Sequence, residues 1–272
     1  MEKKYKLTEE TIKVNGSILH RIEALKDFCD VKKGDKGGYV EKEENLSQSG
    51  DCWVYHNAVV CGDAEVYDDA KVFEDARIYG KARVLDNARV FDNAKVYGNA
   101  AIYGDAKVYC NAKVYGNAKV YCDAKVYGNA IVYGNAKVYE DARIYGNTKV
   151  YHNAAVCGDA VVYCDAKVYG DAVVYDNAKV FEDAEVFGNA EVFGNAEIRG
   201  NAEIASNSDY IVFKNWWSSG RYFTWTKNNN MWKVGCFYGT SNELIEKAYR
   251  DSNESGEEYE KIVKYVESIF KD

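Results

Sequence analysis

A six-residue unit recurs without interruption from Cys52 to about Ile204. Its plainest copies are the consecutive units Ala118-Lys119-Val120-Tyr121-Cys122-Asp123 and Ala124-Lys125-Val126-Tyr127-Gly128-Asn129. Every sixth residue from Ala58 to Ala202 is alanine except Thr148, so the period never slips. A fixed short period of this kind is typical of solenoid proteins, in which each repeat packs only against its neighbours.

Each unit combines a strand pattern with turn residues. In Ala-Lys-Val-Tyr, small and branched residues alternate with charged and aromatic ones, which predicts a four-residue strand with alanine and valine on its inner side. The Gly-Asn or Gly-Asp pair that follows is turn chemistry, because both residue types tolerate positive φ. Three such units, with three strands and three corners, then close a triangular coil. A two-sided coil made of two units is the alternative.

The aliphatic-x-x-x-small-x phrase, as in Val120-Tyr121-Cys122-Asp123-Ala124-Lys125, resembles the hexapeptide-repeat, left-handed β-helix family. The stretch from Ala24 to Tyr55 also resembles the leader of bacterial and phage members that are catalogued as transferases. The resemblance implies an all-β solenoid, a left-handed triangular β-helix with three six-residue units in each coil. It also implies that flat faces pack into a homo-oligomer, a trimer or a dimer.

The chain divides into an N-terminal cap at residues 1–45, the β-helix at 46–205 and a C-terminal α+β module at 206–272. In the cap, Asn15-Gly16 between two alternating segments predicts a β-hairpin, and residues 34–38 predict a tight loop. In the module, residues 210–213, 221–226 and 231–237 predict three strands, and two helices follow. End domains are expected because a bare solenoid leaves two open strand edges.

Composition limits the class of protein. The chain has 272 residues, a formal net charge of −8 and a pI of about 5.2, which argues against nucleic acid as a partner. No apolar segment is long enough to span a membrane, and residues 1–5 lack a signal-peptide core, so we expect a cytoplasmic protein without membrane contact. The eight cysteines lack a disulfide or zinc spacing and are interpreted as free thiols.

The family resemblance implies acyl transfer from an acyl-coenzyme A, with a histidine that deprotonates the acceptor. His56 and His152 are the candidate catalytic residues, and both occupy the turn slot that glycine usually holds. They lie five coils apart on different corners, so they cannot form a pair within one chain, and no loop interrupts the repeat. We therefore expect no catalytic residue, no cofactor and no metal site; acetyl-coenzyme A belongs to the alternative hypothesis only.

Taking every eighteenth residue shows two outward-facing files, each of which is a column of residues at the same position in successive coils. The first file is basic except at Val161: Lys71, Arg89, Lys107, Lys125, Arg143 and Lys179. The second file is aromatic: Phe73, Phe91, Tyr109, Tyr127, Tyr145, Tyr163 and Phe181. Such files suit a polyanion or a nucleotide, so their central residues are candidate binding residues: Lys107, Lys125, Arg143, Tyr109, Tyr127 and Tyr145. The alternative is a solvated face whose cations neutralise an acidic corner row at Asp105, Asp123, Asp141 and Asp159.

The C-terminal module holds a second group of candidate binding residues. Trp216, Trp217, Arg221 and Trp225 lie within ten positions of one another. Dense aromatic residues with arginine are typical of a binding surface. They are equally typical of the core of a small domain, so both interpretations stay open.

These observations favour a non-enzymatic scaffold or decoy that binds a protein or a small anionic ligand. The phage-type resemblance suggests a host protein as the partner. The first alternative is an acyltransferase of the hexapeptide-repeat type. The second is a rod that mimics DNA through its acidic residues, against which the basic file argues.

Overall fold

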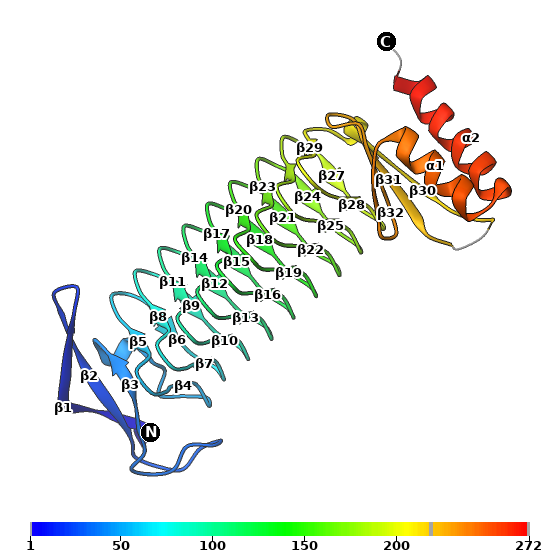
Figure 1. Cartoon of the computed structure of the whole chain (residues 1–272). Helices are drawn as coiled ribbons and strands as arrows, with labels where there is room; N and C mark the ends of the chain where they lie inside the picture. Colours follow the sequence, from blue (N-terminus) through cyan, green and yellow to red (C-terminus); the bar gives the residue numbers. More distant parts are fainter. Residues whose placement is uncertain (1, 218–219, 271–272) are drawn as a thin grey trace.

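The computed structural model describes residues 2–217 and 220–270. The chain forms a long rod of stacked coils, with a β-hairpin cap at the N-terminal end and a sheet-and-helix module at the other end (Figure 1). Each strand of the rod pairs in parallel with the strand three units further on, as Lys107 does with Lys125. The predicted three-sided coil, made of three units, is therefore confirmed.

The strands of the rod form three faces. The twelve-stranded face consists of three strands of the cap, described below, followed by nine strands of the rod: β5 (Val59–Val60), β8 (Arg77–Ile78), β11 (Lys95–Val96), β14 (Lys113–Val114), β17 (Ile131–Val132), β20 (Lys149–Val150), β23 (Lys167–Val168), β26 (Glu185–Val186) and β29 (Glu203–Ile204). The eight-stranded face contains β6 (Glu65–Val66), β9 (Arg83–Val84), β12 (Ala101–Ile102), β15 (Lys119–Val120), β18 (Lys137–Val138), β21 (Ala155–Val156), β24 (Val173–Val174) and β27 (Glu191–Val192). The nine-stranded face contains β4 (Trp53–Val54), β7 (Lys71–Val72), β10 (Arg89–Val90), β13 (Lys107–Val108), β16 (Lys125–Val126), β19 (Arg143–Ile144), β22 (Val161–Val162), β25 (Lys179–Val180) and β28 (Glu197–Ile198).

Alanine and valine fill the interior as predicted. Ala124 and Val126 are fully buried, as are their equivalents in the other coils. The prediction of four-residue strands was wrong, because only the second and third residues of each unit, such as Lys125 and Val126, pair as strand. Thr148 takes one alanine slot without leaving its hydroxyl unpaired, since Oγ1 donates to the Tyr145 carbonyl at 2.7 Å.

Each repeat corner begins with a residue in the left-handed region of φ. Gly128 has φ of +70°, and a Cβ there would lie 3.0 Å from the Gly146 nitrogen in the next coil, so glycine fits this slot best. Where the slot holds a carboxylate, that group accepts the N–H of the next coil in every case except Glu74 among the described residues. Glu140, for example, accepts from the Gly158 amide at 2.6 Å. Local strain at such a corner is thus offset by a hydrogen bond between coils.

Two corners carry ladders of asparagine side chains. Along each ladder the Nδ2 atom of one coil donates to the Oδ1 atom of the next coil. The first ladder comprises Asn99, Asn117, Asn135, Asn153 and Asp171, with distances of 2.9 to 3.0 Å. The second comprises Asn111, Asn129, Asn147 and Asp165, with distances of 2.9 to 3.3 Å. Both ladders end on an aspartate, which can accept but not donate.

The N-terminal cap contains the predicted hairpin and a third strand. Its elements are β1 (Tyr5–Val14), β2 (Ser17–Ala24), β3 (Lys36–Val40) and the 3-10 turn η1 (Glu43–Asn45). Asn15 and Gly16 both have positive φ and form the hairpin turn. The tight loop predicted at residues 34–38 was wrong in its second half, which belongs to β3. A Cβ on Gly37 would lie 2.5 Å from the Val54 carbonyl oxygen, so this glycine permits close packing instead.

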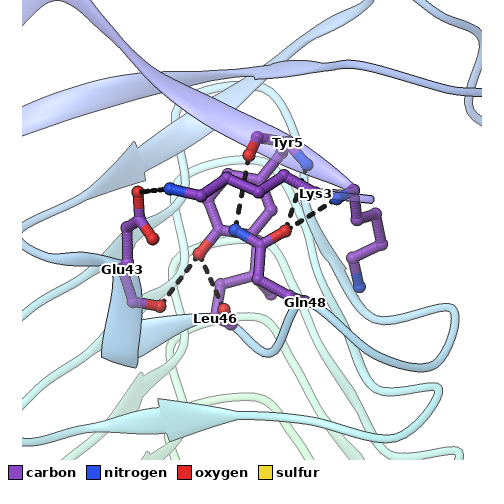
Figure 2. A network of polar contacts seen from close by, with 6 residues as sticks. Lys3, Tyr5, Glu43, Leu46 and Gln48 are labelled. Carbon is purple, nitrogen blue, oxygen red and sulfur yellow. Dashed lines mark hydrogen bonds and ion pairs between the residues drawn. The ribbon is translucent and has the colours of Figure 1, made fainter. Parts of the chain in front are cut away.

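Polar contacts attach the cap to the first coil. Figure 2 shows the Tyr5 hydroxyl between the carbonyl oxygens of Glu43 and Leu46, at 2.9 and 2.7 Å. Lys3 forms an ion pair with Glu43, and Gln48 Oε1 accepts two backbone N–H groups beside them. The Asn45 amide nitrogen then donates to two carbonyl oxygens of the first coil. The cap therefore covers the open strand edge at the N-terminal end of the rod.

The C-terminal module has four strands where the sequence predicted three. They are β30 (Tyr210–Lys214), β31 (Tyr222–Thr226), β32 (Met231–Val234) and β33 (Phe237–Gly239), and they follow the 3-10 turn η2 (Asn207–Asp209). The strand predicted at residues 231–237 splits because Gly235 adopts a φ of +55° and turns the chain back on itself. The two predicted helices are present as α1 (Ser241–Asp251) and α2 (Asn253–Phe270). The division of the chain at residues 45/46 and 205/206 stays a prediction.

Candidate functional site

The predicted basic file lies on the nine-stranded face. Lys107, Lys125 and Arg143 occupy the same outward position in three consecutive coils and are at least partly exposed. Among the described residues, no carboxylate lies within ion-pair distance of these three cations. The predicted acidic corner row beside them therefore forms no direct ion pair with the file. The file holds unpaired positive charge along its central part.

Cations at the two ends of this file are paired. Lys71 contacts Asp30 of the cap at 2.6 Å, and Lys179 contacts Glu197 at 2.9 Å. The ammonium group of Lys71 donates to the Asp30 carboxylate and holds the pKa of Asp30 well below its ordinary range. The cap and the last coils thus limit the unpaired part of the file to the middle of the rod.

The predicted aromatic file lies beside the basic one. The rings of Tyr109 and Tyr127 are 4.8 Å apart with planes 5° from parallel, and those of Tyr127 and Tyr145 are 4.9 Å apart. Because each ring covers its neighbour, no gap remains for a nucleotide base between them. Burial raises the pKa of Tyr109 and Tyr127, so both stay neutral hydroxyl donors at physiological pH. The file therefore suits hydrogen bonding to an anion better than base stacking.

A cleft of about 560 Å³ separates the end of the basic file from the C-terminal module. The nine-stranded face and its adjoining corners contribute Arg143, Asp159, Val161, Asn177, Lys179, Asn195 and Glu197. The module contributes Arg221, Tyr222 and Gly235. Two candidates far apart in sequence, Arg143 and Arg221, thus line the same cleft, which the sequence alone did not predict.

Glu197 organises the wall of the cleft. Its carboxylate contacts Lys179 at 2.9 Å and Lys233 of β32 at 2.8 Å. Burial alone would raise the Glu197 pKa, but the hydrogen bonds from both lysines outweigh burial, and the pKa lies below its ordinary value. The Glu197 backbone N–H also donates to Thr224 of β31 at 3.0 Å. The module is therefore held firmly against the last coils.

The tryptophans of the module occupy different environments. Trp225 is buried in the core of the module and packs against Trp232 and Phe270. Trp217 is half-buried, and its Nε1 atom is buried without a hydrogen-bond partner in the described structure. Trp216 is 83% exposed. Of the three predicted tryptophans, the structure brings none into the cleft that Arg221 lines.

The two candidate catalytic histidines lie on separate corners. His56 follows the nine-stranded face, and its Nδ1 atom lies 3.3 Å from the Glu74 backbone nitrogen. His152 follows the twelve-stranded face and packs edge-on against Tyr151. Both have positive φ, as the turn slot requires. The five intervening coils place them roughly 24 Å apart along the rod, at ~4.8 Å per strand spacing.

A second basic file lies on the twelve-stranded face and was not predicted from the sequence. Its members are Arg77, Lys95, Lys113, Lys149 and Lys167. Ile131 takes the same outward position between Lys113 and Lys149. Taking every eighteenth residue from each of the three strands of a coil, instead of from one strand, reveals this file.

Across residues 2–217 and 220–270, no group of three or more His, Cys, Asp or Glu side chains is arranged to hold a metal ion. Within the same ranges, neither helix has the length and apolar character that crossing a bilayer requires.

Comparison with known proteins identifies similarity within the coils. A family model described as the YdcK beta solenoid repeat matches residues 124–140. The chain is also 38% identical over 69 residues to a protein of Escherichia coli (strain K12) named "Uncharacterized acetyltransferase YdcK". That match covers 22% of this chain and 21% of the relative, so about a fifth of the relative's length is matched. These matches and the three-sided coil confirm the predicted resemblance to hexapeptide-repeat β-solenoids.

Proposed function

We propose that the chain is a rigid binding scaffold that holds a small anionic ligand in the cleft beneath its C-terminal module. The observation that carries this proposal is the meeting of Arg143 from the rod with Arg221 from the module across one cleft. Lys179, which pairs with Glu197, adds a third cation, and Tyr222 and the acidic Asp159 also line the cleft. A small anion can accept hydrogen bonds from several of these groups at once.

The rigidity of the two walls supports this role. One wall belongs to stacked coils, and the other is attached to them through Glu197, Lys233 and Thr224. Because little ordering is required on binding, the interaction free energy is retained. The short carboxylate contacts also keep Glu197 engaged with lysines, so it repels an incoming anion less than an unpaired carboxylate would.

Isothermal titration with phosphate, citrate, nucleotides and acetyl-coenzyme A tests the proposal. We expect one of these anions to bind, and Arg143→Gln to weaken that binding by about tenfold, the loss of one charge-assisted hydrogen bond. Lys125→Gln is the matched control, because Lys125 belongs to the same file one coil outside the cleft. Equal weakening by both variants, or no binding of any anion, would contradict the cleft as the site.

An acyltransferase is the second candidate, favoured by the similarity to the acetyltransferase-named protein of Escherichia coli. Its test is acetyl transfer from acetyl-coenzyme A to a panel of amines and alcohols. Turnover that His152→Ala abolishes and His56→Ala preserves would establish it and replace the scaffold proposal. Under the scaffold proposal, any bound acetyl-coenzyme A is released unchanged.

We also propose that the protein works in the cytoplasm as a dimer or trimer and engages a host protein of a phage-infected cell. The support for oligomers is the family resemblance and the flat faces of the rod. Native mass spectrometry of the purified chain measures the oligomeric state directly. A single monomer peak at micromolar concentration would contradict this proposal.

A further inference from the structure

The twelve-stranded face forms a straight, positively charged strip on an acidic protein. We infer that this strip binds a linear acidic polysaccharide laid along the rod, with one carboxylate or sulfate group per sugar. The site is separate from the cleft beneath the C-terminal module and does not depend on it.

Unpaired cations follow one another along this face. Arg77, Lys95, Lys113 and Lys149 share the same outward position in register, and Ile131 interrupts them once. Among the described residues, none of these four cations lies within ion-pair distance of a carboxylate. One coil further on, Lys167 does pair with Glu185 at 2.6 Å. A glutamate in the next coil can therefore neutralise this position, but none does so in the middle of the rod.

The corners that border this face are free of acidic residues in the middle of the rod. From Asn93 to Asn153, no strand residue of the face and no residue of its two corners is Asp or Glu. The two asparagine ladders occupy these corners. The remaining corner carries the acidic row instead, at Asp105, Asp123, Asp141 and Asp159. A chain of net charge −8 thus concentrates its acids elsewhere and keeps this strip positive.

A groove follows the same strip. It has a volume of about 610 Å³ and is lined by Asp75, Arg77, Asn93, Lys95, Asn111 and Lys113. These residues come from three successive coils, in pairs of one corner residue and one cation. The groove therefore extends along the axis of the rod, as a linear ligand requires.

Hydrogen-bond donors run parallel to the cations. Tyr97, Tyr115 and Tyr133 stack with centroid distances of 4.7 and 5.1 Å, and their hydroxyl groups have no partner within the described chain. Burial raises the pKa of Tyr97 and Tyr115, which keeps these hydroxyls neutral. In each ladder, an asparagine nitrogen uses one of its two N–H groups and keeps the other for a ligand. The coils of Lys95, Lys113 and Lys149 therefore repeat one set of groups, a cation, a phenol and two amides, and the coil of Ile131 lacks only the cation.

The spacing of this set favours a polysaccharide over a nucleic acid. Neighbouring coils are about 4.8 Å apart, which is close to the length of one sugar in an extended 1,4-linked chain, so the strip and the sugar chain repeat at similar intervals, with the cation missing beside Ile131. Inserting a base between two rings needs roughly 7 Å, two van der Waals contacts, whereas the rings of Tyr115 and Tyr133 are 5.1 Å apart. Single-strand binding normally depends on such stacking. Duplex phosphates wind around an axis and do not follow a straight file.

The experiment titrates the purified full chain with oligogalacturonates of increasing length, at low and at physiological salt. We expect affinity to rise with oligomer length until the strip is filled and to fall as salt is added. Neutral amylose oligomers should not bind. Binding of amylose as tight as that of oligogalacturonate, or no oligogalacturonate binding at any length, would overturn the inference.

Two matched triple variants locate the site. Lys95→Gln, Lys113→Gln and Lys149→Gln together remove three charges from the strip and should weaken binding about tenfold or more. The control combines Arg83→Gln, Lys119→Gln and Lys137→Gln, which removes three charges from the eight-stranded face. It should weaken binding less than about twofold, as expected for net charge alone. Equal weakening by both triples would overturn the inference.

Two further measurements complete the test. Circular dichroism and thermal unfolding must show that both triples fold, and removal of unpaired like charges should leave the melting temperature unchanged or raise it. Competition with polyphosphate and with single-stranded oligonucleotide of equal charge identifies the polymer. If either competitor binds more tightly than oligogalacturonate, the strip is a general polyanion site and the assignment to a polysaccharide is wrong.

Discussion

Asn135→Asp tests whether the asparagine ladders stabilise the rod. Asn135 accepts from Asn117 at 3.0 Å and donates to Asn153 at 2.9 Å. Aspartate keeps the first bond, loses the second and places its charge beside the Asn153 carbonyl oxygen. A lost hydrogen bond with this repulsion should cost about 1–2 kcal/mol, and ~1 kcal/mol lowers the melting temperature by about 2–4 °C in a chain of this size class. We therefore expect a decrease of roughly 3–6 °C.

The matched control is Asp171→Asn at the end of the same ladder. Asp171 only accepts, from Asn153 at 2.9 Å, and asparagine accepts equally well. Its effect should lie within about 0.5 kcal/mol of zero. Urea unfolding at constant m-value measures both differences, and below about pH 4 protonation should return a donor to Asn135→Asp and shrink its deficit. Equal losses from the two variants would refute the directional ladder.

Three further outcomes are expected. Val126→Asp places an unpaired charge in the fully buried interior and should abolish soluble protein. Lys125→Asp changes an outward side chain and should shift the melting temperature by less than about 3 °C. Similar yields and melting curves for the two variants would contradict the assignment of Val126 to the interior and Lys125 to the surface. Lys4→Met leaves the carbonyl oxygens of residues 49, 50 and 52 without their buried donor and should destabilise the cap by about 3 kcal/mol, measured by hydrogen exchange of β1. The depressed pKa of Asp30 means that its pairing with Lys71 stabilises the fold above about pH 4 and is lost as pH falls further, so Asp30→Asn and wild type should differ in urea stability at pH 7 and converge in acid.

The coil was predictable because a single slot pattern decides it. Alanine and valine recur at fixed positions, and a coil that buries them must leave lysine outside, whereas the number of units in each coil was left open between three and two. The pairing of strands between coils follows from the same six-residue period, because residues three units apart must be neighbours in a three-sided coil. The two-residue strands were not predicted, because the left-handed corner takes up part of each unit that the alternating pattern assigns to strand.

The ends of the rod were harder to predict. The sequence pattern assigns Gly37 to a turn, although this glycine provides room for the Val54 carbonyl of the first coil, and only the packed structure shows that contact. Gly235 divides a segment whose apolar pattern continues on both sides of it. The cleft joins Arg143 to Arg221, and no periodicity connects a repeat with a separate module. The cleft therefore lies where the repeat ends, and counting along the repeat cannot find it.

The constancy of the coil has a consequence for evolution. Every interior coil presents the same edge to its two neighbours, so duplication or deletion of one whole coil leaves both end domains seated on an equivalent surface. Gene recombination within the repeats can therefore lengthen or shorten the rod in one step without redesigning a core. Only the number of coils that contribute binding groups would change. Related proteins with different coil numbers would then bind ligands of different length through the same kinds of side chain.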